Sequence, residues 1–281
     1  MTVGIVGLGL MGASFALSIK RKGEDKVFGF DKDQSVLLKA SLLNCIDGEL
    51  NEQTVGQVDL LIISVYPRDF SKVCERFLPF MKDGAIVIDF CGNKVSVCDS
   101  MKKLSKKYQN VWLLGGHPMA GREFSGIDRA IKTLFDKASM ILVPVKADIF
   151  IEERIKKYFL ELGFGEVVFT DAETHDKNIA FTSQLCHVVS NAFIKSDTAK
   201  LHHGFSAGSY KDLTRVARLN SNLWSQLMID NAENLSCELK TLIDNLSKYY
   251  IALENKDQEE LKKLLEDGNL LKIEIDARNK K

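Results

Sequence analysis

The sequence has few prolines, no excess of charge of either sign and no closely spaced cysteines. Lys and Arg total 38, as do Asp and Glu, so no global field attracts nucleic acid or an anionic membrane surface. Four prolines in 281 residues, with 45% hydrophobic and 27% charged residues, argue against disorder and fibrous repeats. The length predicts one large or two ordinary domains of a soluble globular protein.

The six cysteines are scattered and include no C-x-x-C pair: Cys45, Cys74, Cys91, Cys98, Cys186 and Cys237. We therefore expect no zinc ribbon or other metal site, no disulfide framework, and a reducing, cytoplasmic location. The longest hydrophobic run, around residues 60–65, is far shorter than the ~20 residues that cross a bilayer. No basic residue precedes the apolar N-terminus, so we expect no signal peptide.

Short β-branched segments alternate with helix-like stretches as far as residue 169. They are Val3–Val6, Val27–Phe30, Leu60–Ile63, Ile86–Ile88, Val111–Leu114, Met140–Val143 and Val167–Phe169. Strands that alternate with helices predict an α/β fold with a parallel, doubly wound sheet of the Rossmann type. Each segment is apolar on both faces, which is typical of strands covered by helices on both sides.

The strand pattern stops after Phe169, and residues 170–174 offer helix N-cap chemistry. We therefore predict a Rossmann domain over residues 1–169 and an all-helical domain over residues 170–281. From Met228 onward, apolar residues recur at alternating spacings of four and three: Met228, Ala232, Leu235, Leu239, Leu242, Leu246, Tyr249 and Leu253. Such a seam belongs to a long helix that packs on another, either within the domain core or at a subunit interface.

A glycine-rich motif, Gly7-Leu8-Gly9-Leu10-Met11-Gly12, follows the first predicted strand and opens a predicted helix that runs to about Lys20. In that context the glycines make a tight turn and let the backbone approach a pyrophosphate; the alternative is a plain turn between strand and helix. Asp31 ends the second strand, where a carboxylate accepts hydrogen bonds from the adenosine ribose. The motif residues, Asp31 and Ser64 are the predicted cofactor-binding residues. Asp31 favours NAD over NADP by repelling a 2′-phosphate, although the adjacent Lys32 can tolerate one.

A second glycine-rich segment, Gly115-Gly116-His117-Pro118-Met119-Ala120-Gly121, follows the fifth predicted strand. His117 is therefore expected near the carboxyl edge of the sheet, where ligands of open α/β sheets bind. An imidazole of ordinary pKa, ~6.5, can accept a proton near neutral pH while a nicotinamide accepts a hydride. The alternative is a histidine that caps a loop carbonyl.

These motifs, together with Thr182-Ser183-Gln184-Leu185-Cys186-His187 and Lys211-Asp212-Leu213-Thr214-Arg215-Val216-Ala217, resemble those of the prephenate and arogenate dehydrogenases of tyrosine biosynthesis. The resemblance covers most of the chain. It implies a Rossmann domain followed by a helical dimerisation domain, a homodimer, and NAD-dependent oxidative decarboxylation of prephenate to 4-hydroxyphenylpyruvate and CO2. An arogenate dehydrogenase is the alternative within the family.

The resemblance also implies roles for individual residues. His117 accepts the proton of the ring C4 hydroxyl while C4 gives a hydride to the cofactor, and His187 lines the pocket for the substrate side chain. Arg215 grips a substrate carboxylate, although the residues alone favour a surface ion pair with Asp212. The predicted substrate-binding residues are Arg215, His187, Gln184, Arg122, Asp212 and Trp224.

Several positions depart from the family pattern. Gly92 stands where many members have a serine that bonds the histidine or the C4 hydroxyl, so a water or the Asn93 amide has to substitute. Gln184 replaces a histidine, and Arg122 replaces a small hydroxyl residue. The chain ends soon after the predicted helices, so we expect no regulatory ACT domain, and any feedback by tyrosine acts at the catalytic site.

Two other classes of dinucleotide-binding protein are alternatives. The Gly-Leu-Gly-x-Met-Gly start also resembles the β-hydroxyacid dehydrogenases, but residues 174–178 lack the glycines that accompany the catalytic lysine of that class. A regulator that binds a dinucleotide without chemistry is disfavoured by His117 and Arg215. Within the resembled family, Arg122, Gln184 and His187 offer no carboxylate for the ammonium of arogenate, which favours prephenate unless Glu123 faces the pocket.

Overall fold

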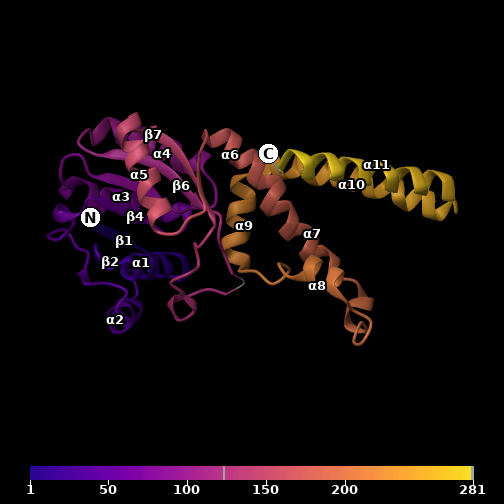
Figure 1. Ribbon diagram of the computed structural model, residues 1–281, viewed down its shortest axis with the longest axis horizontal. Helices are drawn as coiled ribbons and strands as arrows, with labels where there is room; N and C mark the ends of the chain where they lie inside the picture. The colour runs from indigo at the N-terminus through magenta and orange to yellow at the C-terminus, as the bar shows by residue number, and fades with distance from the viewer. Residues whose placement is uncertain (123, 280–281) are drawn as a thin grey trace. The chain divides into compact units, whose positions relative to one another are not determined.

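A computed structural model describes residues 1–122 and 124–279, which form two compact units divided after residue 231 (Figure 1). The first unit contains the whole sheet and the helices up to α9 (Ser221–Asp230), and the second contains α10 (Ala232–Glu254) and α11 (Gln258–Asn279). Within these ranges no helix is both long enough and apolar enough to cross a membrane. The predicted boundary at residues 169 and 170 stays a prediction.

The sheet has eight strands in the order β3-β2-β1-β4-β5-β6-β7-β8. Their bounds are β1 (Thr2–Val6), β2 (Lys26–Phe30), β3 (Gly48–Glu49), β4 (Leu60–Ile63), β5 (Ile86–Asp89), β6 (Trp112–Pro118), β7 (Ser139–Lys146) and β8 (Glu166–Phe169). All seven predicted strands are present, and the sequence missed only β3, whose two residues are too few to show a pattern. The predicted doubly wound α/β fold with a helical C-terminal region is confirmed.

Two strands, β7 and β8, depart from the predicted parallel arrangement. β7 runs antiparallel to β6, with His117 opposite Ile141, and β8 then pairs parallel to β7. Parallel neighbours need a crossover, usually a helix, and the described residues between β6 and β7 form no helix other than the short 3₁₀ turn Ile127–Arg129. The chain therefore returns beside β6 in the opposite direction.

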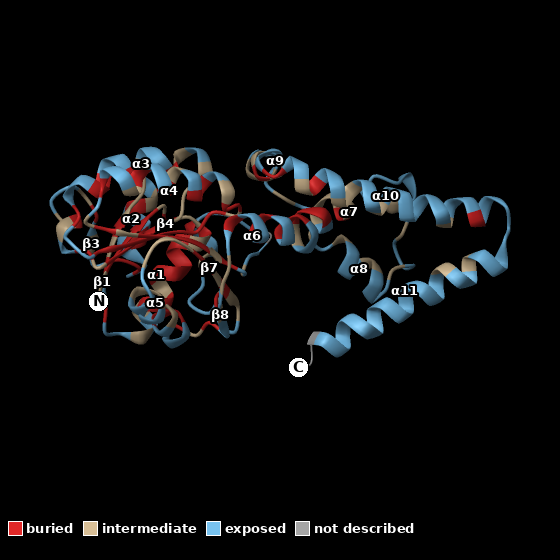
Figure 2. Cartoon of the chain, turned by 90° about the horizontal axis from the view of Figure 1, so that it is seen from above, coloured by how far each residue is buried: buried red, intermediate tan, exposed pale blue. Residues whose placement is uncertain are grey.

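Side chains of the central strands alternate between two cores. Leu60 and Ile62 pack in one cluster with Phe15, whereas Leu61 and Ile63 pack in the other with Phe77. The first cluster is covered by α1 (Leu10–Lys22), α2 (Gln34–Leu42) and α5 (Ile149–Glu161), and the second by α3 (Phe70–Phe77) and α4 (Val95–Lys107). Because both faces are covered, the strands are apolar on both sides and appear buried in Figure 2.

The helical region begins at α6 (Ala172–Ile179), whose N-cap is Asp171: its carboxylate accepts the Thr174 N–H at 2.7 Å. A π-helical segment, Ala180–Leu185, links α6 to α7 (Cys186–Phe193), and α8 (Gly208–Thr214) and α9 follow. The predicted long helix after Met228 is interrupted at Asn231, so Met228 lies in α9 and the rest of the seam in α10.

Candidate active site

The glycine-rich loop lies at the point where the strand order reverses. β1 leads to β2 on one side of the sheet, while β4, on the other side of β1, leads outward to β5 and β6. Ligands of open α/β sheets bind at the carboxyl ends of the strands beside such a switch point. Gly7 follows β1 there, and Ser64 follows β4, with its N–H bonded to the Val6 carbonyl at 2.7 Å. The fold thus brings the predicted cofactor-binding residues Gly7 and Ser64 to one edge.

The three glycines of the glycine-rich loop have different surroundings, so each is required for a different reason. Gly7 has a φ of +89°, and a Cβ added there would lie 2.3 Å from the Ser64 carbonyl oxygen. A Cβ on Gly12 would lie 1.9 Å from the Gly7 carbonyl oxygen, so these two glycines are needed for the protein's own packing. A Cβ on Gly9 would meet no protein atom within 4 Å. The open space over Gly9 is what close approach of a pyrophosphate to the backbone requires, so the loop fits a dinucleotide.

The start of α1 is also suited to phosphate. Its N-cap residue, Gly9, provides no side-chain cap, and no acidic residue occupies the first turn, so the N–H groups and the positive end of the helix dipole are available to an anion. Leu8 and Leu10 bury their side chains and Met11 packs against the core, so these motif residues present backbone rather than side chain to a ligand.

Asp31 lies directly after β2 and is half-buried. One carboxylate oxygen accepts the Leu8 N–H at 2.8 Å and the other accepts the Asp33 N–H at 3.0 Å. Each oxygen has a second lone pair, so the carboxylate can still accept hydrogen bonds from ribose hydroxyls. The contact with Leu8 also fixes Asp31 against the glycine-rich loop.

His117 occupies the carboxyl end of β6, within the strand rather than after it, and its ring is half-buried. Its Nδ1 lies 2.9 Å from Nε2 of His175, which is buried on α6. Among residues 1–122 and 124–279, none hydrogen-bonds to Nε2 of His117. Burial lowers the pKa of His117 well below its usual value, and the positive charge of Lys94 and the neighbouring His175 lower it further. The imidazole is therefore neutral at neutral pH, as a general base requires.

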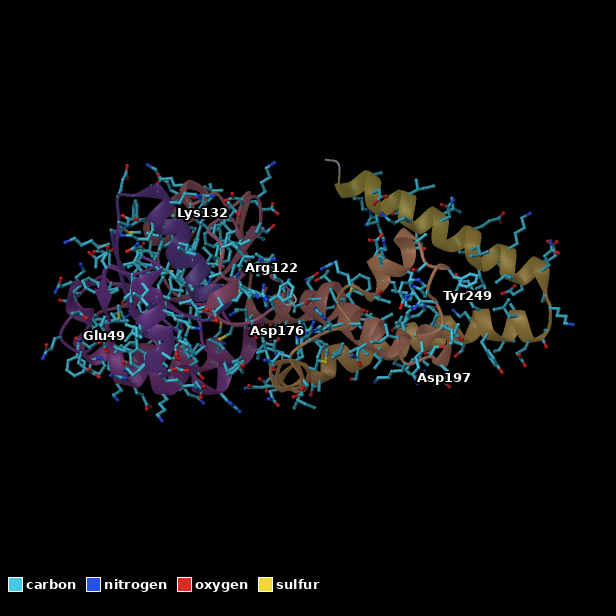
Figure 3. The ribbon with its side chains drawn as sticks, turned by 90° about the horizontal axis from the view of Figure 1, so that it is seen from below. Glu49, Arg122, Lys132, Asp176, Asp197 and Tyr249 are labelled. Atoms are coloured by element: carbon cyan, nitrogen blue, oxygen red, sulfur yellow. The ribbon has the colours of Figure 1, made fainter. Side chains whose placement is uncertain are left out.

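The second histidine is held in turn by its neighbour Asp176, labelled in Figure 3. Nδ1 of His175 lies 2.7 Å from a carboxylate oxygen of Asp176. The same oxygen accepts the backbone N–H of Lys94 at 2.7 Å, and the other oxygen accepts the backbone N–H of Val95 at 2.9 Å. Asp176 therefore also caps the start of α4. Sequence reasoning missed His175 and Asp176, although an adjacent His-Asp pair at the start of a predicted helix was a visible signal.

A buried ion pair lies beneath this site. The Lys94 ammonium pairs with the Asp89 carboxylate, and both side chains are fully buried. Asp89 also accepts the Cys91 N–H at 2.8 Å and the Gly116 N–H at 3.1 Å, which ties the end of β5 to the strand that carries His117. The Asp89 carboxylate accepts from these two N–H groups as well as from the Lys94 ammonium, which helps to compensate the burial of its charge.

A second group of predicted residues gathers on α7, α8 and α9. Nδ1 of His187 is 3.0 Å from the Val216 carbonyl oxygen, and its ring centroid is 3.7 Å from that of the half-buried Trp224. Arg215, next to Val216, is exposed at the end of α8, and Asp212 is exposed one turn earlier. The structure thus brings His187 and Trp224 together beside the segment that carries Arg215.

Gln184 lies in a buried network with other amides. Its Nε2 donates to Oδ1 of Asn93 at 3.0 Å, and its Oε1 accepts from Nδ2 of Asn231 at 2.9 Å. Asn93 also donates to the Leu227 carbonyl at 2.7 Å, so both ends of its amide have partners other than His117. A Cβ on Gly92 would lie 3.2 Å from Leu227, which leaves a serine side chain little room. His175 is the described residue that contacts Nδ1 of His117.

Arg122, labelled in Figure 3, is exposed on the loop after β6, and its guanidinium lies over the Phe124 ring, 5.4 Å from the centroid. Its predicted contact with substrate stays a prediction. Glu123, the carboxylate that would favour arogenate, lies outside the residues that the structure describes.

Comparisons with known proteins agree with this architecture. The family model "Prephenate dehydrogenase, nucleotide-binding domain" matches residues 15–164, and "Prephenate dehydrogenase, dimerization domain" matches residues 171–267. The chain is 32% identical to the cyclohexadienyl dehydrogenase of Zymomonas mobilis over 271 residues, covering 91% of this chain and 89% of the relative.

Two solved structures are similar over nearly their whole length. Prephenate dehydrogenase from A. aeolicus, in complex with hydroxyphenyl propionate and NAD+, has a TM-score of 0.82 and 26% identity over 98% of both chains. Synechocystis arogenate dehydrogenase has a TM-score of 0.80 and 25% identity over 98% of this chain and 100% of that one. Because the two family models match successive parts of the chain and the Zymomonas relative is 32% identical to it, this chain belongs to the prephenate dehydrogenase family.

Proposed function

We propose that this protein is an NAD-dependent prephenate dehydrogenase, which converts prephenate to 4-hydroxyphenylpyruvate and CO2 in tyrosine biosynthesis. The observation that carries the proposal is the position of His117. It ends a strand at the sheet edge that also bears the glycine-rich loop, and its Nδ1 is held by His175 while Nε2 has no partner among the described residues. A base and a dinucleotide site at one edge are the two requirements of hydride transfer from an alcohol carbon.

The chemistry follows from these positions. Bound NAD supplies the acceptor for the hydride that leaves C4 of the substrate ring. Nε2 of His117 accepts the proton of the C4 hydroxyl, which makes C4 a carbonyl carbon. The C1 carboxylate then leaves as CO2, its bonding electrons enter the ring, and the aromatised C4 oxygen recovers the proton from His117. The neutral imidazole is therefore regenerated in each turnover.

Substrate binding is assigned to the helical region in this proposal. Arg215 would hold a carboxylate with its planar, bidentate fork, and His187 with Trp224 would line the side-chain pocket. Arg122 and Asp212, both exposed, would contribute from the loop after β6 and from α8. Gln184, whose amide is engaged on both sides, would act by holding α7 in place.

Arogenate is the second candidate substrate, because the Zymomonas relative is named for the cyclohexadienyl class and one solved relative is an arogenate dehydrogenase. Arogenate carries an ammonium where prephenate carries a keto group, and among the predicted substrate-binding residues only Asp212 is acidic. Steady-state kcat/KM for both substrates at one saturating NAD concentration decides between them. We expect a higher value for prephenate, and a higher value for arogenate would refute this assignment.

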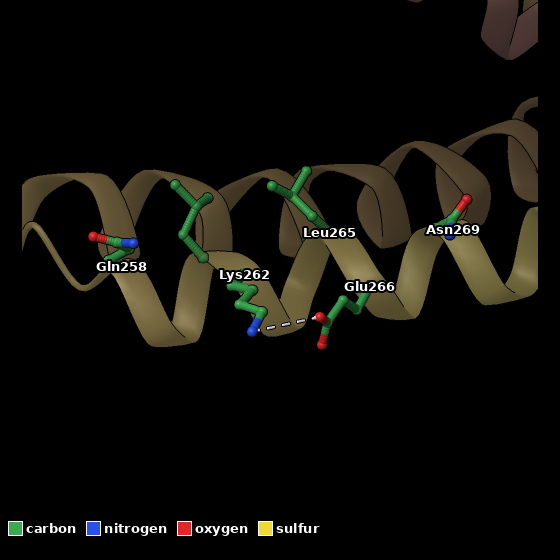
Figure 4. Close-up of a pocket in the computed structure, with 6 residues that line it drawn as sticks. Gln258, Lys262, Leu265, Glu266 and Asn269 are labelled. Atoms are coloured by element: carbon green, nitrogen blue, oxygen red, sulfur yellow. Dashed lines mark ion pairs between the residues drawn. The ribbon is translucent and has the colours of Figure 1, made fainter.

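We also propose a homodimer formed through α10 and α11. Both helices are mostly pale blue in Figure 2, and they expose large apolar side chains: Ile243, Leu246, Tyr250, Ile251, Leu253, Leu265, Leu270, Leu271, Ile273 and Ile275. A hollow on α11 is lined by Gln258, Leu261, Lys262, Leu265, Glu266 and Asn269 (Figure 4). An apolar surface of this extent is typical of a subunit interface. Light scattering should give twice the chain mass of 31.5 kDa.

A cytoplasmic location completes the proposal. All six cysteines are free thiols, and burial raises the pKa of Cys74 and Cys91 well above the usual value, so these thiols stay protonated. Unpaired cysteines are typical of proteins that work in a reducing compartment.

A further inference from the structure

The contact between His117 and His175 determines which ring nitrogen of His117 carries the hydrogen. A neutral imidazole donates from one nitrogen and accepts at the other. Nδ1 of His175 faces an Asp176 carboxylate oxygen that already accepts the Lys94 N–H, so this nitrogen of His175 must donate. Nε2 of His175 is then an acceptor, and the Nδ1 of His117, 2.9 Å away, must be the donor.

We propose that His175, held by Asp176, fixes His117 in the tautomer with hydrogen on Nδ1, which leaves the Nε2 lone pair as the proton acceptor. The catalytic role of this tautomer rests on the function proposed above. His175 is a positioning residue, since it acts through His117. It supplies the contact that a serine at position 92 makes in many family members, where Leu227 leaves little room for such a side chain.

The arrangement also suits the charged state of the base. When His117 accepts a proton at Nε2, its Nδ1 still donates to His175, so no hydrogen bond has to be remade during the reaction. The charged groups on the elements packed around the two rings are Lys94 at the start of α4, Asp89 at the end of β5 and Asp176 on α6. Lys94 and Asp89 pair with each other. Asp176, in contact with His175, is thus the carboxylate that balances a positive charge on the pair of rings.

Two substitutions at one position separate positioning from packing. His175→Gln supplies an amide oxygen near the former Nε2, which can accept from His117, whereas His175→Leu supplies no acceptor. We expect His175→Leu to lower kcat by ~10² to 10³, in line with the effect of a wrong histidine tautomer, and His175→Gln to recover at least about tenfold of the loss. KM for NAD should be unchanged in both.

A control substitution tests for mere loosening of α6. Asp171→Ala removes the N-cap of the same helix without touching either histidine, so it should lower the melting temperature but leave kcat and its pH profile as in the wild type. If Asp171→Ala lowers kcat as much as His175→Leu, the role of His175 is structural and the proposal is overturned.

The tautomer itself can be observed without substrate. The chain has five histidines, so ¹⁵N-histidine NMR can resolve them, and the spectrum of His117→Asn identifies the signals of His117. The wild type should show hydrogen on Nδ1 of His117, and His175→Leu should change this pattern. Hydrogen on Nε2 in the wild type would overturn the proposal, even if the His175 variants fail to fold. A wild type that reduces NAD with neither prephenate nor arogenate would refute the proposed function but not the tautomer assignment.

Discussion

Alanine at the second and third motif glycines should have opposite consequences, because the two residues face different neighbours. Gly9→Ala adds a methyl group where no protein atom lies within 4 Å, and its φ of −68° suits alanine. We expect the free energy of unfolding without cofactor to change by less than about 1 kcal/mol, the usual range for an N-cap exchange. The methyl group enters the space proposed for the pyrophosphate, so the Kd for NAD should rise by about 10- to 100-fold, or about 1.4 to 2.8 kcal/mol.

Gly12→Ala should do the reverse. Its methyl carbon would lie 1.9 Å from the Gly7 carbonyl oxygen, so β1 and α1 must move apart. Overpacking of this kind costs about 1 to 3 kcal/mol or more, which should appear as a lower denaturation midpoint without any ligand. Calorimetric titration with NAD and urea denaturation measure the two quantities separately. Wild-type NAD affinity in Gly9→Ala would show that the open space over Gly9 does not hold the cofactor.

Three further outcomes follow from the site. Asp31→Ser should shift the preference from NAD toward NADP in comparative kcat/KM measurements, because it removes both the ribose acceptor and the repulsion of a 2′-phosphate; a wild type that already prefers NADP would refute this. Lys94→Met should lower the free energy of unfolding by about 3 to 5 kcal/mol, because the buried Asp89 carboxylate loses its cation. The matched control, Lys102→Met, removes an exposed ion pair with Asp99 and should lower the free energy of unfolding by less than about 1 kcal/mol. Because the pKa of His117 lies well below its usual value, the imidazole stays neutral as the pH falls, so kcat/KM should decline only at a pH well below about 6.5; a decline centred at 6.5 would contradict the burial of the ring.

The strands and the cofactor loop could be predicted because their signals are local. β-branched runs such as Leu60–Ile63 are buried on both faces, and the spacing of the motif glycines reflects one turn between a strand and a helix. The direction of β7 could not be predicted in this way. It depends on the connection from β6, whose described residues form no crossover helix, and turn-forming residues in a loop do not indicate the direction in which the chain returns.

The orientation of the base could not be predicted from the sequence because it depends on a distant contact. His117 and His175 are 58 positions apart, and only the approach of α6 to the end of β6 brings their rings together. For the same reason the sequence did not show that the Gln184 amide bonds to Asn93 and Asn231, and its predicted place in the substrate pocket stays a prediction. The residue types indicated the chemistry, but the hydrogen-bond partners of each polar atom could be identified only once the fold was known.

The most direct test of the account is the turnover of His117→Asn with prephenate and saturating NAD, followed at the nicotinamide absorbance band. Asparagine keeps a polar side chain at the end of β6 but cannot accept the C4 hydroxyl proton as an imidazole does. We predict a fall in kcat of ~10² to 10⁴, with the Kd for NAD within about threefold of the wild type. A variant that keeps wild-type kcat would contradict the assignment of His117 as the base of an NAD-dependent dehydrogenase.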